Sequence, residues 1–211
     1  MNVLWVKRVF DRICAAVGLV LFSPLMVGIA IMIRRKMGAP VFYCSARIGQ
    51  FGEPFTMIKF RTMLRDADKA PQGSITTGGD PRITPLGAFL RRFKLDELPE
   101  LWNVLKGDMS LVGPRPDVPG YADQLQGEDR EVLQLKPGIT GPVTLKYANE
   151  EALLAEVDAP VRYNNEVIFP DKVRINREYL HKWSIWKDLR IIWKTVFLLP
   201  QNPVVFLLRD Y

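Results

Sequence analysis

The sequence predicts an α+β protein that is mainly helical, contains one small β-hairpin, and attaches to a membrane as a monotopic protein. Three observations support this prediction. An uncharged apolar run is interrupted by proline at its middle, two short β-rich segments flank a glycine-containing turn, and tryptophans recur at helical spacing near the C-terminus. We therefore expect a re-entrant membrane helix over residues 1–36 and a cytoplasmic domain with interfacial amphipathic helices over residues 37–211.

The apolar run extends from Ile13 to Ile33 and contains no charged residue. As a helix it would be roughly 31 Å long, which is enough to cross a bilayer core of about 30 Å. Ser23-Pro24 lies at its middle, where proline removes a backbone donor and produces a kink. Each half is then about 15 Å long, which is half a bilayer. Ser23 is well placed to bond a carbonyl that the kink frees.

Basic residues flank this run on both sides. A spanning helix usually has its excess of Lys and Arg on the cytoplasmic side. Symmetric flanks favour a helix that enters the membrane, bends at Ser23-Pro24 and returns to the same face. A kinked transmembrane helix is the alternative, whereas a cleaved signal peptide fits less well because cations follow the run directly. The flanking cations are Lys7, Arg8 and Arg12 before the run and Arg34, Arg35 and Lys36 after it.

The next segments predict a hairpin, a loop and a helix. Val41–Arg47 and Phe55–Phe60 have the composition of short strands, and the Gly-Gln-Phe-Gly sequence at 49–52 is a plausible hairpin connection. Residues 65–80 contain charges, glycines and a proline, so we expect a mobile loop there. Thr84–Phe93 is predicted to be helical.

The central segment predicts a second helix and a turn. Asp96 is expected to be the N-cap of a helix that runs to about Lys106 and ends at Gly107, with Pro99 in its first turn. Residues 136–142, with the sequence KPGITGP, are predicted to form turns.

The C-terminal segment from Lys172 to Phe197 has a helical pattern in which tryptophans alternate with basic residues. Indoles and cations at this spacing are typical of a helix in the head-group zone of a membrane. A core helix with inward-facing tryptophans explains the spacing equally well. The apolar residues Val204–Leu208 predict a second contact with the membrane surface.

Composition limits the chemistry. The formal charge of +6 and the pI near 9.4 favour anionic partners, which are nucleic acid, anionic lipids or phosphorylated substrates. Cys14 lies inside the apolar run and Cys44 well outside it, so no disulfide framework is expected and a reducing compartment is indicated. The single histidine, His181, makes a His-based zinc site or a Ser-His-Asp triad implausible.

Two adjacent carboxylates, Asp96 and Glu97, are the candidate catalytic residues and the candidate ligands of a metal. The N-terminus of a helix favours an ionised carboxylate and attracts phosphate oxygens, so a capping Asp96 is compatible with attack on phosphorus. Glu97 points roughly 100° away around a helix, which indicates a different role. Magnesium prefers one or two carboxylates together with substrate phosphates. A cap for Asp96 and a solvated first-turn position for Glu97 are the structural alternatives.

Basic residues near these acids are candidates for binding substrate phosphate. Arg115 lies between Pro114 and Pro116, which restrict its backbone, and its planar guanidinium suits bidentate phosphate binding. Lys59, Arg61 and Arg91 are further candidates, although each alone is also explained as a solvated charge. Asp108 is a candidate second acid near the metal or, alternatively, a turn residue.

Seven longer segments of the sequence together carry a resemblance to one protein family. They are the basic start with the Ser23-Pro24 helix, then PVFYCSARIG, FTMIKFRTM, DPRITPLGAFLRR, KLDELPELWNVLKGDMSLVGPRP, KPGITGP and YLHKWSIWKDLRIIWKT. In these segments the chain resembles the monotopic phosphoglycosyl transferases, the bacterial enzymes that begin glycan assembly on a polyprenol phosphate carrier. The resemblance covers nearly the whole chain.

The resemblance implies that Asp96 is the nucleophile, Glu97 serves a Mg²⁺ site and Arg115 holds a substrate phosphate. It also implies a re-entrant helix broken at Ser23-Pro24, and transfer of a phosphosugar from a UDP-sugar to undecaprenyl phosphate with release of UMP. The expected location is the cytoplasmic face of the bacterial inner membrane, among membrane lipids. A homodimer is compatible with the resemblance, and the chain is expected to be the minimal catalytic form without an extra membrane domain.

Two segments depart from the family pattern. Asn176 stands where many relatives carry aspartate, which places a supporting ion pair in doubt, and residues 147–171 match least well and are candidates for sugar recognition. A non-catalytic, membrane-bound basic module that binds nucleic acid or anionic lipid is the competing hypothesis. Such a module has no need of adjacent acids beside a stiff arginine loop, and nucleic-acid signatures are not apparent. The sequence does not identify the sugar or the glycan pathway.

Overall fold

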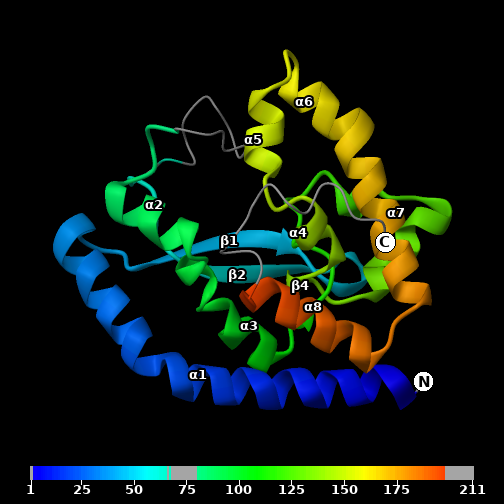
Figure 1. Cartoon of the computed structure of the whole chain (residues 1–211), viewed down its shortest axis with the longest axis horizontal. Helices are drawn as coiled ribbons and strands as arrows, with labels where there is room; N and C mark the ends of the chain where they lie inside the picture. Colours follow the sequence, from blue (N-terminus) through cyan, green and yellow to red (C-terminus); the bar gives the residue numbers. More distant parts are fainter. Residues whose placement is uncertain (1, 66, 68–79, 198–211) are drawn as a thin grey trace.

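The computed structural model describes residues 2–65, 67 and 80–197, and it confirms a mainly helical chain with one small antiparallel hairpin (Figure 1). Most of the predicted loop at 65–80 and the apolar segment Val204–Leu208 lie outside the described residues. The helices and strands are α1 Asn2–Met37, β1 Phe42–Ile48, β2 Pro54–Phe60, α2 Pro85–Arg92, α3 Glu100–Lys106, β3 Ser110–Val112, β4 Gly138–Thr140, α4 Pro142–Lys146, α5 Glu150–Ala155, α6 Pro160–Tyr163, α7 Phe169–His181 and α8 Ile185–Phe197. Short 3₁₀ turns are η1 Gln50–Gly52, η3 Leu95–Glu97, η4 Ala122–Gln124 and η5 Gly127–Gln134, and η6 Asn164–Ile168 is a π-helical turn.

The N-terminal helix α1 is continuous but bent, with Pro24 inside it (Figure 1). Proline has no N–H, so it cannot donate to the carbonyl of Val20, four residues earlier. The hydroxyl of Ser23 donates to that carbonyl instead, at 2.8 Å. The prediction that Ser23 bonds a carbonyl freed by the kink is therefore confirmed, and the bend divides α1 into two arms.

Each arm of α1 packs one narrow face against the rest of the chain. Ala15 of the first arm joins a cluster with Val104, and Ile29 and Ile33 of the second arm join a cluster with Phe60 and its neighbours. All other elements lie on the concave side of the bend (Figure 1). The outer face is apolar and exposed, with Val17, Val20 and Leu21 each more than 60% exposed. Among the described residues, α1 is the one helix long and apolar enough to cross a membrane.

Polar contacts also attach both arms to the same domain. In the first arm, Lys7 donates to the carboxylate of Asp188 in α8 at 2.5 Å, and both residues are buried. Asp188 also accepts bonds from Tyr179 and Trp183. At the other end of α1, the guanidinium of Arg61 donates to three consecutive backbone carbonyls that begin at Met37. Both ends of the apolar helix are therefore held by one folded unit.

Lys7→Met is expected to lower the free energy of unfolding by about 3 kcal/mol or more, because it leaves the Asp188 carboxylate buried without its cation. Arg8→Met is the matched control, since Arg8 is the next residue and is exposed, and we expect a change within about 0.5 kcal/mol. Denaturation of both variants in detergent tests this. Equal stability of the two would show that the buried pair adds nothing.

The hairpin matches its prediction closely. β1 pairs with β2 antiparallel, from Phe42 opposite Phe60 to Ile48 opposite Pro54, and η1 forms the connection. Thr84 caps α2 by accepting a bond from the backbone N–H of Gly87 at 3.0 Å. These elements follow from local residue patterns.

The predicted turns at 136–142 contain strand β4, which pairs with β3 in parallel. Glycines permit this close approach. A Cβ on Gly138 would lie 2.1 Å from the backbone nitrogen of Gly113, and a Cβ on Gly141 would lie 2.1 Å from its carbonyl oxygen. Substitution at either glycine would displace the segment that leads into Arg115.

The C-terminal helical pattern is interrupted, which corrects the expectation of continuous helical structure from Lys172 to Phe197. α7 ends at His181 and α8 begins at Ile185, because Ser184 accepts a bond from the backbone N–H of Lys187 and starts a new helix. Trp186 is 77% exposed and Trp193 is 54% exposed, whereas Trp183 packs against the core. Part of the tryptophan pattern therefore faces outward and part faces inward.

Candidate active site

Asp96 lies in the 3₁₀ turn η3 and does not cap α3, so the predicted N-cap is wrong. An N-cap side chain accepts from the backbone N–H two or three residues later. The third residue after Asp96 is Pro99, which has no N–H. The chain instead closes a tight turn, with the N–H of Leu98 bonded to the carbonyl of Leu95, and α3 starts at Glu100. The predicted end of the helix at Lys106, with Gly107 in the left-handed conformation, is confirmed.

The Asp96 side chain is buried, and its Oδ1 atom has no hydrogen-bond partner among the described residues. Burial raises the pKa of Asp96, and the negative charge of Glu97 raises it further. Lys59, Lys94 and Arg91 oppose this shift by lowering the pKa. An unpartnered carboxylate oxygen, in a group whose raised pKa three nearby cations partly lower, is suited to attack an electrophile or to bind a cation.

The ammonium group of Lys59 lies between two carboxylates. It is 2.7 Å from Oε1 of Glu97 and 3.0 Å from Oε1 of Glu100. A guanidinium nitrogen of Arg115 is 3.6 Å from the same oxygen of Glu97. Lys59 comes from β2, the acids come from η3 and α3, and Arg115 comes from the loop after β3, so three parts of the chain meet here.

These contacts separate the protonation behaviour of the two glutamates. Burial tends to raise the pKa of Glu97, but Lys59 and Arg115 outweigh it and lower the pKa to about 2. Burial raises the pKa of Glu100 to about 7, because Lys59 offsets only part of the effect and the charge of Glu97 adds to it. At neutral pH Glu97 is therefore the firmly ionised member of the pair.

The other predicted residues occupy different places. Arg91 donates to the hydroxyl of Thr62 at 3.3 Å, and its charge lowers the pKa of Asp96. Arg61 is turned to the end of α1, as described above, and takes no part in the Lys59 cluster. Asp108 pairs with Lys106 at 3.0 Å, at the opposite end of α3, which fits a turn residue.

Glu100 was not predicted as a site residue, although it is 2% exposed and contacts Lys59. The sequence does contain a pattern that could have identified Glu100. Glu100 follows Glu97 by three residues, a spacing that places two acids on one side of a helical turn.

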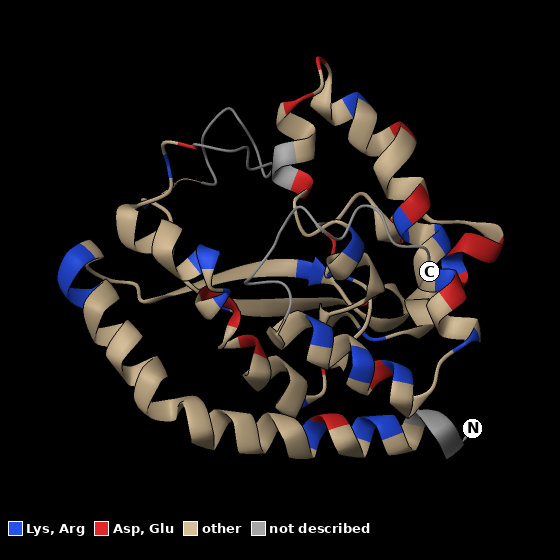
Figure 2. Cartoon of the chain, in the orientation of Figure 1, with Lys and Arg blue, Asp and Glu red and all other residues tan. Residues whose placement is uncertain are grey.

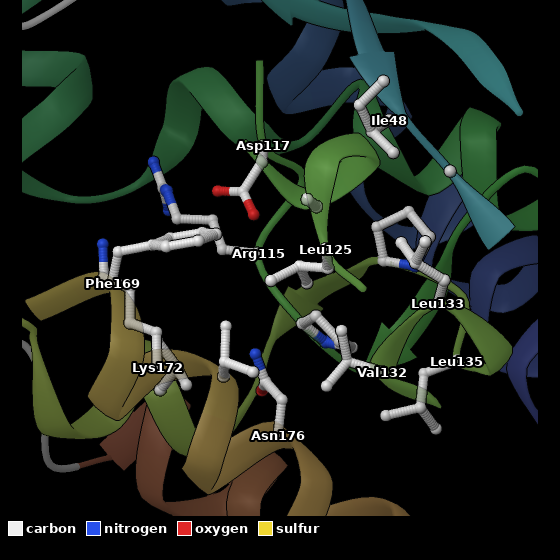
Figure 3. Close-up of a pocket in the computed structure, with 16 residues that line it drawn as sticks. Ile48, Arg115, Asp117, Leu125, Val132, Leu133, Leu135, Phe169, Lys172 and Asn176 are labelled. Carbon is white, nitrogen blue, oxygen red and sulfur yellow. The ribbon is translucent and has the colours of Figure 1, made fainter. Parts of the chain in front are cut away.

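Arg115 also borders two small cavities. One, of about 30 Å³, lies beside Lys59, Glu97 and Glu100. The other, of about 40 Å³, has Arg115, Asp117 and Lys172 toward one end and apolar side chains such as Leu133 toward the other (Figure 3). Burial raises the pKa of Asp117 to about 6, although Lys172, Arg115 and Arg47 lower it.

The two departures from the family pattern lie around this second cavity. Asn176 lines it, is buried, and makes no ion pair, and its Oδ1 atom has no partner among the described residues. Glu150, from the poorly matching segment 147–171, pairs with Lys172 at 2.7 Å. Phe169 of the same segment lines the cavity directly (Figure 3), and the predicted role of the segment in sugar recognition stays a prediction.

Comparison with known proteins decides the family. The model of the bacterial sugar transferase family matches residues 2–202. The chain belongs to the bacterial sugar transferase family. Membership confirms the resemblance noted in the sequence, and it favours an enzyme over a non-catalytic binding module.

Individual relatives agree with this assignment. The chain is 34% identical to the exopolysaccharide production protein ExoY of Rhizobium meliloti, over 90% of this chain and 83% of that protein. It is 36% identical to the UDP-glucose:undecaprenyl-phosphate glucose-1-phosphate transferase of Caulobacter vibrioides, over 90% of this chain and 68% of that protein. It is 34% identical to the undecaprenyl-phosphate galactose phosphotransferase of Salmonella typhimurium, over 90% of this chain. The chain spans only 40% of the length of that third relative.

Proposed function

We propose that this sugar transferase moves a phosphosugar from a UDP-sugar to undecaprenyl phosphate, releases UMP, and forms a covalent intermediate on Asp96. This is the first membrane step of glycan assembly. The observation that carries the proposal is the buried, unpartnered oxygen of Asp96 beside the ionised Glu97 and its two cations. The names of relatives that act on UDP-glucose and undecaprenyl phosphate support this choice of substrates.

In the first step, the Asp96 carboxylate attacks the phosphorus attached to the sugar. A bond forms between the carboxylate oxygen and phosphorus, and the bond from phosphorus to the bridging oxygen breaks, so UMP leaves with that oxygen. In the second step, a phosphate oxygen of undecaprenyl phosphate attacks the same phosphorus. The aspartyl bond breaks, the carboxylate is regenerated, and the lipid diphosphate sugar is released.

The neighbouring cations stabilise the negative charge on the oxygens of the phosphoryl group during transfer. Arg115 is presented by two prolines and is suited to bind two phosphate oxygens at once. Lys59 supplies a second charge from β2, held by Glu97 and Glu100. Preorganised cations of this kind are typically a large contribution to the catalysis of phosphoryl transfer.

Asp96 and Glu97 are suited to hold a Mg²⁺ ion that arrives with the diphosphate. Magnesium commonly binds one or two carboxylates and completes its shell with phosphate oxygens and water. The unpartnered oxygen of Asp96 fits such a ligand. Within the described part of the chain, no three acidic, histidine or cysteine side chains gather into a metal site, so the substrate has to supply ligands. The bound ion would neutralise phosphate charge.

Removal of magnesium is expected to reduce turnover to background, and added Mg²⁺ should restore it. The measurement is UMP release after thorough chelation, with circular dichroism recorded on the same sample to show that the fold persists. Turnover that survives chelation would count against a role for Glu97 in metal binding.

The proposed location is the cytoplasmic face of the bacterial inner membrane, with residues 1–36 embedded as a re-entrant helix and residues 37–211 forming a cytoplasmic domain whose amphipathic helices lie at the membrane surface. Lys and Arg lie at both ends of α1 and are absent from its middle (Figure 2). Contacts through Lys7 and through Arg61 attach both ends to one domain. A helix held in this way supports an arrangement in which both ends face the same side of the membrane.

The topology is tested with Asn2→Cys and Lys36→Cys, each made in a chain with Cys14→Ser and Cys44→Ser. In intact cells, we expect neither introduced cysteine to react with a membrane-impermeant thiol reagent. Both should react after lysis, because both ends face the cytoplasm. Labelling of either position before lysis would rule out the re-entrant arrangement. Pro24→Ala in the same background tests whether the kink alone sets this topology.

The function itself is tested by supplying purified protein with a panel of UDP-sugars and undecaprenyl phosphate, and by measuring UMP. The expected result is release of UMP with at least one sugar and formation of the matching lipid diphosphate sugar. A protein that binds the lipid but releases no UMP with any member of a broad panel would support the binding-module hypothesis instead.

A further inference from the structure

Two exposed phenylalanines form an apolar surface on α2. Phe89 is 51% exposed and Phe93, just after the helix, is 48% exposed, and their ring centroids are 5.1 Å apart. Leu86 and Leu90 of the same helix belong to a hydrophobic cluster with Ile29 in the second arm of α1. Because residues three or four apart share a helix face, the phenylalanine pair borders the side of α2 that joins a hydrophobic cluster with the second arm of α1.

Basic residues lie between and directly after the two phenylalanines, in the sequence Phe89-Leu-Arg-Arg-Phe-Lys. The guanidinium carbon of Arg92 is 5.6 Å from the centroid of the Phe93 ring. Lys94 has a left-handed backbone conformation, which is uncommon for a residue with a side chain and often marks a functional turn. The positive charges of Lys94 and Arg91 both lower the pKa of Asp96. The surface therefore presents apolar area and positive charge together.

The nucleophile lies directly after this surface. Leu95 and Leu98, on either side of Asp96, pack into the same cluster as Leu90 and the second arm of α1. Asp96 follows Phe93 by three residues in the sequence, and its turn η3 contacts α2. A lipid seated against Phe89 and Phe93 would have its phosphate near Asp96.

We propose that the Phe89–Phe93 face binds the polyprenyl chain of the acceptor and sets the preference for long chains. This inference rests on the proposed function. The occupant is identified by charge complementarity, because a polyprenol phosphate has an apolar chain for the rings and an anion for Arg91, Arg92 and Lys94. The exposed aromatic residues of α8 lie on a helix that packs with α4, β3 and β4, and so mark a separate surface.

The experiment uses Phe89→Ala/Phe93→Ala in detergent micelles, where bulk lipid is absent. We compare kcat/KM for undecaprenyl phosphate with kcat/KM for geranyl phosphate, an acceptor with a short chain. In wild type we expect a clear preference for the long chain. The double variant should lose about tenfold with undecaprenyl phosphate and little with geranyl phosphate, in line with the loss of apolar contact area.

Two matched variants sharpen the result. Phe89→Leu/Phe93→Leu keeps apolar side chains and should retain most of the preference. Trp186→Ala/Trp193→Ala removes two other exposed aromatics from α8 and should leave the preference unchanged. An equal loss with both acceptors in the alanine variant, or an equal effect of the tryptophan variant, would overturn the proposal and indicate a general lipid anchor.

The first half-reaction separates this inference from the proposed function. Wild type and the phenylalanine variant are each incubated with UDP-sugar alone, and the mass of the intact protein is measured. An adduct in both, together with an unchanged chain-length preference, defeats only the inference. No adduct in either, without UMP release, defeats the proposed function.

Discussion

Asp96→Asn is expected to abolish phosphosugar transfer, with a loss of at least about three orders of magnitude in turnover, while the protein remains folded. Asparagine has nearly the same size but lacks the anionic oxygen that attacks phosphorus. Burial raises the pKa of Asp96 above its ordinary value. The protonated carboxyl group of Asp96 therefore favours folding at low pH, and this contribution is lost as pH rises through the raised pKa. Replacing it by a neutral amide at pH 7 should be neutral or slightly stabilising.

The decisive measurement for this variant is the mass of the intact protein after incubation with UDP-sugar alone. Wild type should gain the mass of a phosphosugar and release UMP without any acceptor. The asparagine variant should show neither. Wild type should also follow ping-pong kinetics, because the nucleotide product leaves before the lipid reacts.

Asp108→Asn is the matched control, since Asp108 lies in the same motif but pairs with Lys106 at the far end of α3. It should retain near wild-type activity. Kinetics that require both substrates together, with no adduct on wild type, would replace the covalent mechanism by direct attack of the lipid phosphate.

The features that the sequence predicted correctly depend on short-range rules. The hairpin follows from two β-rich segments around a glycine turn, and it forms with the expected strands. The contact of Ser23 with the carbonyl of Val20 follows from the missing N–H of Pro24. In both cases the partners belong to the same or to consecutive elements of the chain, so the local pattern alone was sufficient.

The errors arise where distant segments decide the outcome. Lys59 and Arg61 are two residues apart and would share a face of an extended strand. β2 ends at Phe60, however, so Arg61 turns to the carbonyls at the end of α1 and Lys59 alone reaches the acids. The role of Glu100 likewise depends on the approach of Lys59 from β2. The incorrect cap at Asp96 is different, because the absent N–H of Pro99 was visible in the sequence.

Arg115→Ala is expected to lower kcat/KM for the UDP-sugar by about two to three orders of magnitude, with little change in stability. The side chain is about half exposed, at 46%, and its proline-framed loop keeps its shape without it. Glu97 should stay ionised in this variant. Lys59, the stronger of the two cations lowering the pKa of Glu97, remains 2.7 Å away, so the pKa rises from about 2 but stays below neutrality.

The loss of activity in Arg115→Ala therefore reports the contact with substrate phosphate rather than a change in Glu97. Arg115→Lys keeps the charge but replaces a planar fork by a point charge, so we expect only partial recovery, about tenfold above the alanine variant. Arg130→Ala removes an exposed arginine outside segment 147–171 that donates to the backbone carbonyls of Asp123 and Leu125, and its activity should match wild type. Initial rates over a range of UDP-sugar concentrations provide the comparison. Full activity in Arg115→Lys would mean that positive charge alone, and not bidentate geometry, is what the phosphate requires at this position.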